Sequence, residues 1–149
     1  MSERIERTTL KNLIHNEDYS RKVLPFIKED YFSNRLEKIL FSEIFKFTTQ
    51  YNKLPTRETL EIDIQNRRDI TDEEYKQIVA LIQSLNPEDI NLDWLVETTE
   101  KFCKDRAIHN AVMDGIQILE RKDTRRTPEA IPEILSDALG VSFDSHVGH

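Results

Sequence analysis

The chain has 149 residues and a net charge of −7, and its 38% hydrophobic and 33% charged residues suit one soluble domain of amphipathic helices. Its only glycines are Gly115, Gly140 and Gly148, so the patterns GxxxxGK[ST] and GxGxxG are absent, which excludes nucleotide binding by either loop. Cys103 is the single cysteine, which excludes an intramolecular disulfide, and no apolar run approaches the roughly 20 residues that cross a bilayer.

Two amphipathic segments open the chain. Apolar residues recur at helical spacing between about residues 3 and 15, which predicts a first helix. A second segment, between residues 23 and 27, contains Pro25, whose ring breaks a helix interior. We therefore expect only a turn or two there.

The third segment has a clearer pattern. Apolar residues keep helical spacing from Leu36 to about Tyr51, and the sequence of residues 52–55 then stops the helix. Thr56 is placed to cap a fourth, short helix that ends near Arg67. The pattern predicts two helices joined by a tight connection.

The best local signal follows the fourth helix. Thr71 and Glu74 have the spacing of a capping box, in which each side chain accepts a hydrogen bond from the backbone N–H of the other residue. Ile70 and Tyr75 stand at the two positions of a hydrophobic staple. These features predict the start of a fifth helix, and Asn86-Pro87 predicts its end.

The C-terminal third predicts two long elements. Residues 92–122 contain no proline and one glycine, so we expect a single helix of about 45 Å at 1.5 Å per residue. A polar turn follows over residues 121–128, and a last helix includes Ile131–Leu139, with Pro132 in its first turn and Gly140 as its C-terminal cap. These two helices are expected to form an antiparallel hairpin.

Two-residue alternation is weak throughout, so no sheet is expected. The sequence predicts an all-α fold in which a helical globule over residues 1–90 precedes a helical hairpin over residues 91–141.

A row of small residues marks one face of the long predicted helix. Ala107, Ala111 and Gly115 are four residues apart, so a second helix can approach them closely. That second helix is either the last helix of the same chain or one from a second copy, and both contacts can coexist. The candidate self-association face comprises Ala107, Ile108, Ala111, Val112, Gly115, Ile116, Leu119, Ile134, Leu135 and Leu139.

Four basic residues gather in the polar turn: Arg121, Lys122, Arg125 and Arg126. They form a candidate patch for an acidic partner or for DNA phosphates. The alternative is a turn that water alone solvates, since Glu120 and Asp123 dilute its charge.

Nothing in the sequence indicates catalysis or a metal centre. None of the four histidines, at positions 15, 109, 146 and 149, lies four residues from another on a predicted helix. No serine or cysteine has a base at a motif spacing, and no pair of carboxylates is placed in a cleft. We therefore expect no catalytic, metal-binding or cofactor-binding residues, and no enzyme activity.

Several segments, taken in order, look familiar. They are Tyr51–Pro55, Asp93–Lys101, Arg106-Ala107, Ala130–Leu135 and Ser142–His149. Together they resemble the N-terminal domain of the DnaB family of hexameric replicative DNA helicases, of the T-even phage type, and the resemblance extends over essentially the whole chain.

The resemblance implies a small helical globule followed by a helical hairpin. It also implies a non-catalytic role in DNA replication, in the cytoplasm of an infected bacterial cell. In this family the N-terminal domains form a collar on the helicase ring, hairpins pair as dimers within the hexamer, and related collars dock primase. ATP and Mg²⁺ belong to a separate RecA-like motor domain, which is missing from this chain, and residues 142–149 would begin the linker to it. Weak or no DNA binding and no membrane contact are expected.

A rival hypothesis is a stand-alone all-α DNA-binding regulator. On this hypothesis the short helices around Thr56 to Leu85 would mimic a helix-turn-helix. The helix that would read DNA, over residues 72–85, is acidic at its start and has Lys76 as its only base. Tight, strongly salt-dependent binding to duplex DNA would favour this rival.

Overall fold

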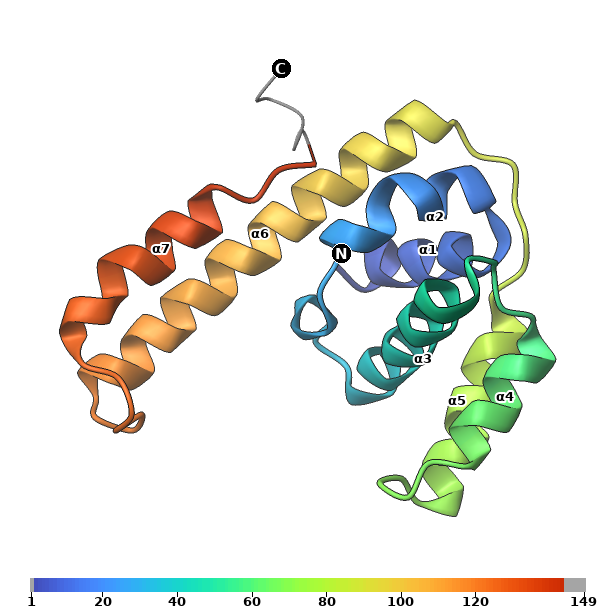
Figure 1. The fold of residues 1–149 in the computed structure, drawn as a ribbon, viewed down its shortest axis with the longest axis horizontal. Helices are drawn as coiled ribbons and strands as arrows, with labels where there is room; N and C mark the ends of the chain where they lie inside the picture. Colours follow the sequence, from blue (N-terminus) through green and yellow to red (C-terminus); the bar gives the residue numbers. More distant parts are fainter. Residues whose placement is uncertain (1, 144–149) are drawn as a thin grey trace. The chain divides into compact units, whose positions relative to one another are not determined.

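The structure is a computed structural model, and it describes residues 2 to 143. The seven α-helices of this part are α1 (Ser2–His15), α2 (Glu17–Val23), α3 (Arg35–Tyr51), α4 (Arg57–Gln65), α5 (Asp72–Ser84), α6 (Leu92–Leu119) and α7 (Ile131–Leu139) (Figure 1). Short 3-10 helices occupy Leu24–Phe26, Glu29–Tyr31 and Pro128–Ala130. No strand occurs in the part of the chain that the structure describes, which confirms the predicted all-α class.

The chain divides into two compact units, one that ends at Thr99 and one that begins at Glu100. The boundary lies inside α6, whereas the sequence placed it near residue 90. The predicted linker start, at residues 142–149, lies outside the described residues from position 144 onward.

The first unit has its core around α3, which packs against α1, α4 and α5 (Figure 1). Leu10 and Leu13 of α1 and Leu40 and Ile44 of α3 are fully buried. Each pair is three or four residues apart, so it lies on one side of its helix. The helical spacing recognised in the sequence therefore identifies the core-facing sides of α1 and α3.

Helix starts in the first unit follow local capping chemistry. The backbone N–H of Thr71 donates to Glu74 Oε1 and that of Glu74 donates to Thr71 Oγ1, both at 3.0 Å, which confirms the predicted capping box of α5. Thr56 caps α4 as predicted. The sequence did not indicate α2, whose backbone N–H at Tyr19 donates to the side chain of Asn16.

An ion-pair network holds the connection between α4 and α5 against α3. Arg67 donates to Glu43 Oε2 at 2.6 Å and to Asp69 Oδ2 at 2.7 Å. Glu43 is only 2% exposed, and Lys46 Nζ lies 3.0 Å from its other oxygen. The hydrogen bond from Arg67 lowers the pKa of the exposed Asp69 carboxyl below its ordinary value. A buried carboxylate is stable only when it keeps such partners.

The second unit is a helical hairpin. Figure 1 shows α7 running back beside α6, and a Cβ built on Gly115 of α6 would lie 3.7 Å from Ile131 Cγ2. At the other end of the hairpin, Glu100 Oε2 accepts hydrogen bonds from the backbone N–H of Phe143 at 2.9 Å and from Ser142 Oγ at 3.2 Å. Residues near the end of the described chain therefore lie beside the start of this unit, as an antiparallel hairpin requires.

Helix α6 ends three residues earlier than the sequence suggested. Arg121 adopts a left-handed conformation with φ of 61°, its N–H donates to Ile118 O, and the N–H of Lys122 donates to Gln117 O. This is a Schellman termination, which usually places glycine where Arg121 stands. Gly140, which was expected to cap α7, does so with φ of −85° and uses no left-handed backbone.

None of the helices in the described part of the chain is both long enough and apolar enough to cross a lipid bilayer.

Cys103 is expected to resist thiol reagents in the folded protein. The thiol is fully buried, and this burial, together with the nearby charge of Glu100, raises its pKa to about 12. Because the thiolate is the reactive form, Ellman's reagent at pH 8 should label the native chain far more slowly than the urea-unfolded chain. Rapid stoichiometric labelling in native buffer would contradict the burial of this side chain.

Candidate protein-interaction surface

Helix α6 presents apolar residues on two faces within the second unit. Ala111, Gly115 and Ile118 are buried, at spacings of four and three residues. The other face holds Val112, Met113, Ile116 and Leu119, which we call the exposed stripe; these side chains are 41% to 65% exposed. Spacings of one, three and four residues keep them on one side of the helix. Because α7 covers only one of these two apolar faces, the other face of α6 is left exposed.

The structure distributes the predicted self-association residues between these two faces. Ala111 and Gly115 are buried, and Gly115 lies against Ile131 of α7. The half-buried members are Ala107, Ile108, Ile134 and Leu135, and the exposed members are Val112, Ile116, Leu119 and Leu139. The small-residue row therefore supports packing within the hairpin, while the larger aliphatic side chains beside it are available to a neighbour.

Sequence reasoning missed Met113, which extends the exposed stripe, and Ile118, which belongs to the buried face. Both follow the same three- and four-residue spacings as their neighbours. The missing information was the side of α6 that meets α7, and the close approach at Gly115 supplies it.

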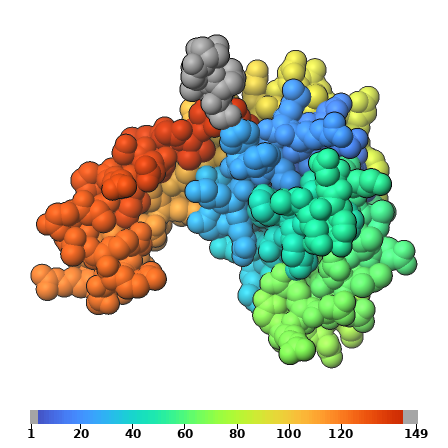
Figure 2. Space-filling view, viewed as in Figure 1, coloured from blue at the N-terminus to red at the C-terminus, as the bar shows by residue number. Residues whose placement is uncertain are grey.

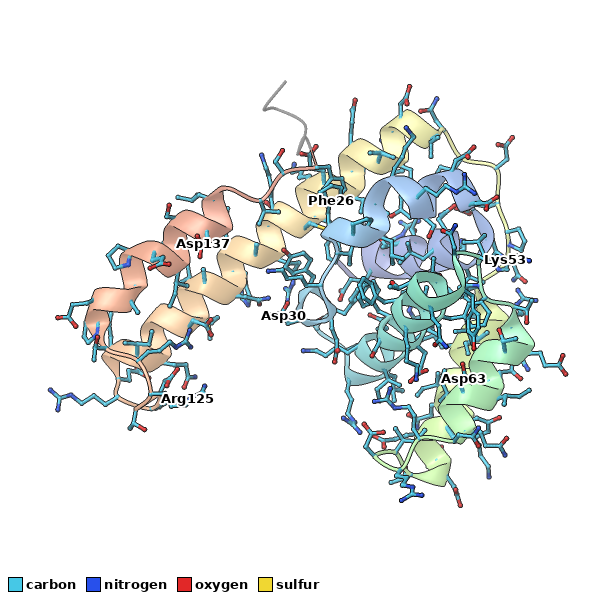
Figure 3. All side chains as sticks on the ribbon, viewed as in Figure 1. Phe26, Asp30, Lys53, Asp63, Arg125 and Asp137 are labelled. Carbon is cyan, nitrogen blue, oxygen red and sulfur yellow. The ribbon has the colours of Figure 1, made fainter. Side chains whose placement is uncertain are left out.

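The predicted basic patch is a folded turn organised by an acidic residue. Asp123 accepts hydrogen bonds from the backbone N–H of Arg125 at 3.0 Å and from Arg126, at 2.9 Å from Nε and 2.7 Å from a terminal nitrogen. Lys122 pairs with Glu120 at 3.2 Å. Arg125 is on the same turn (Figure 3), and its side chain is 86% exposed.

These contacts shift the ionisation of the turn. The hydrogen bond from Arg126 lowers the pKa of the Asp123 carboxyl, and the same bond raises the pKa of the Arg126 guanidinium. Three of the four predicted basic residues are thus paired with local acidic partners: Lys122 with Glu120, and Arg125 and Arg126 with Asp123. Arg121 makes no ion pair with a residue that the structure describes, so it contributes the least neutralised charge.

The described residues contain no cluster of metal ligands. No group of three or more histidine, cysteine, aspartate or glutamate side chains is placed to hold a metal ion there. His15 Nε2 donates to the carbonyl of Leu85 at 2.8 Å, which is a structural contact, and His109 is exposed on α6. His146 and His149 lie outside the described residues.

The helices proposed for a DNA reader have the wrong charge for that role. The first turn of α5 carries Asp72, Glu73 and Glu74, and Glu74 pairs with Arg35 at 3.0 Å. A helix that enters a groove of DNA needs basic or neutral polar residues at such a position. The exposed stripe is the stronger candidate surface, because contiguous exposed apolar residues mark protein contacts.

Comparison with known proteins gives one informative match. No protein-family model matches the chain. The chain is 35% identical over 150 aligned residues to a DnaB-like replicative helicase of Enterobacteria phage T4, an alignment that covers 94% of this chain and 31% of that protein. It thus spans about a third of the length of this relative. The chain is therefore similar, over nearly all of its length, to the N-terminal part of a DnaB-like replicative helicase.

Proposed function

We propose that this chain is the non-catalytic N-terminal collar domain of a phage replicative DNA helicase and serves DNA replication in the infected bacterial cell. The similarity to the T4 helicase supports the role in replication. On this proposal, ATP hydrolysis belongs to a motor domain elsewhere in the helicase, and the collar contributes contacts between subunits and a docking surface for primase.

The single observation that carries the proposal is the exposed stripe on α6. Exposure of four large apolar side chains to water on one side of a helix is unfavourable in free energy. A second copy that supplies the same stripe would bury both sets. A twofold contact uses one self-complementary surface on each subunit, so it needs no further partner.

Self-association of the chain tests the proposal. We expect the mass measured by sedimentation equilibrium to rise with concentration, and Ile116→Glu to weaken this association about tenfold or more, since a buried charge would face the partner's stripe. Gln117→Glu is the matched control, because it adds the same charge to the next exposed position of α6. A monomer at every concentration, or equal effects of the two variants, would remove the stripe from the proposal.

Primase docking has its own test. The primase of the same replication system should bind the chain in isothermal titration. If the paired hairpins form the docking surface, the primase should bind the Ile116→Glu variant more weakly than the Gln117→Glu variant. Absence of binding to the unmodified chain would remove primase from the proposal and leave subunit contact as the role of the domain.

A further inference from the structure

A hollow of about 360 Å³ lies at the tip of the hairpin, where α6 passes into the turn before α7. Its apolar lining comes from Ile118, Leu119 and Pro128. Its charged lining comes from Arg121, Arg126 and Asp123. We call this site the tip hollow; in Figure 2 the tip is the orange end of the second unit. An apolar floor beside cationic groups suits a ligand that carries both an apolar group and a negative charge.

Arg121 occupies a backbone position that is unfavourable for it. Its φ of 61° lies in the left-handed region, where glycine is stable and other residues are strained. Such residues concentrate at functional sites. The side chain of Arg121 has no ion-pair partner among the described residues, so its charge is available to a ligand.

The acidic residue that lines the tip hollow, Asp123, is already paired with other residues of the turn. Asp123 is held by Arg126 and by the backbone of Arg125, and its side chain is only 9% exposed. Its carboxylate therefore orients Arg126 without closing an ion pair on Arg121. The tip hollow keeps one unneutralised guanidinium beside its apolar floor.

We propose that the tip hollow binds an apolar side chain flanked by a carboxylate, presented by an acidic amphipathic segment of a partner protein. The apolar side chain packs on Leu119 and Pro128, and the carboxylate accepts hydrogen bonds from Arg121. This contact goes beyond the proposed pairing of hairpins, because the tip hollow shares only Leu119 with the exposed stripe.

A protein segment fits the site better than nucleic acid. Binding to a phosphate backbone draws on several basic side chains at once, whereas Lys122 and Arg126 are paired with acidic neighbours. The net charge of −7 also repels a polyanion such as DNA. A partner segment that presents a single carboxylate beside an apolar side chain needs only one guanidinium, that of Arg121.

Two capped tripeptides that differ only in charge test the inference: acetyl-Glu-Leu-Glu-amide and acetyl-Gln-Leu-Gln-amide. Titrated into the isotope-labelled chain, the acidic peptide should shift the NMR signals of residues 118–128 saturably, with a dissociation constant in the millimolar range. The neutral peptide should bind about threefold or more weakly. Equal binding of both peptides, or no saturable shift at the tip, would overturn the proposal.

Two substitutions at Arg121 separate binding from folding. Arg121→Gln should weaken the acidic peptide about threefold or more, and Arg125→Gln, on the same turn but outside the tip hollow, should change it little. Arg121→Gly should raise the midpoint of thermal unfolding, because glycine relieves the left-handed strain, and should still lose binding. If Arg121→Gly is more stable and binds the peptide as before, Arg121 has no role in recognition.

A third experiment tests whether the tip hollow prefers the carboxylate of a protein segment to the phosphates of DNA. A 12-base-pair DNA duplex should cause no saturable shift at residues 118–128 at physiological salt. Saturable duplex binding that Arg121→Gln abolishes would contradict the proposal and assign the tip to nucleic acid. Ile116→Glu should leave the affinity for the acidic peptide unchanged, so failure of hairpin pairing can be told apart from failure of this inference.

Discussion

Gly115→Leu is expected to destabilise the hairpin by about 1–3 kcal/mol, because the added side chain must enter space that Ile131 of α7 already fills. Gly115 is buried, and a Cβ there would stand 3.7 Å from Ile131 Cγ2, an ordinary van der Waals contact. One methyl group therefore fits at this position, but a branched four-carbon side chain does not. Thermal or urea unfolding followed by circular dichroism measures the effect.

Gly115→Ala is the matched control and should have the opposite sign. Alanine fits the space and removes the entropic penalty of glycine in a helix, so it should stabilise the hairpin by about 0.5–1 kcal/mol. If leucine and alanine both stabilise the protein, α7 does not pack on this face of α6. If both destabilise it strongly, the approach of the two helices is closer than 3.7 Å implies.

Arg67→Ala is expected to destabilise the first unit by about 2–4 kcal/mol, since it leaves Glu43 buried without its closest cationic partner. Lys46 still pairs with Glu43 at 3.0 Å in this variant. The loss of stability should therefore be smaller than for a buried carboxylate with no cationic partner. Arg68→Ala is the control, because that neighbouring arginine is exposed. Equal losses of stability in the two variants would contradict the network.

The same substitution has a pH signature with a definite sign. Arg67 holds the pKa of Asp69 below its ordinary value of 3.8, so this pair stabilises the fold above that pH and the contribution is lost as pH falls through the lowered pKa. The difference in unfolding free energy between the unmodified chain and Arg67→Ala should therefore shrink below about pH 3.8. A difference that grows on acidification would contradict the assignment.

Local chemistry made much of the fold predictable. The capping box at Thr71 and Glu74 depends on residues three apart, and the core sides of α1 and α3 follow from repeated apolar spacing. Helix α2 was not predictable in the same way, because its residues 17–22 are mostly polar. Its start depends on one capping side chain, that of Asn16.

The sequence predicted the helix that carries the candidate surface, but not which side of that helix is exposed. Apolar residues surround much of α6, so spacing alone could not say which of them meet α7 and which meet solvent. The sequence showed that Asp123 dilutes the charge of the basic turn, but which arginine it binds depends on the fold, where it accepts hydrogen bonds from Arg126. The strain at Arg121 depends on where α6 stops, and no cap residue in the sequence marked that point.

The central claim is that the exposed stripe is the surface through which copies of this chain meet. Methyl NMR spectra recorded across a concentration series test it most directly, since Val112, Met113, Ile116 and Leu119 all carry methyl groups. The account predicts concentration-dependent shifts at these four residues, with the buried methyl groups of Leu10 and Ile44 unchanged. Shifts confined to the first unit, or spectra that stay constant while the mass increases, would contradict it.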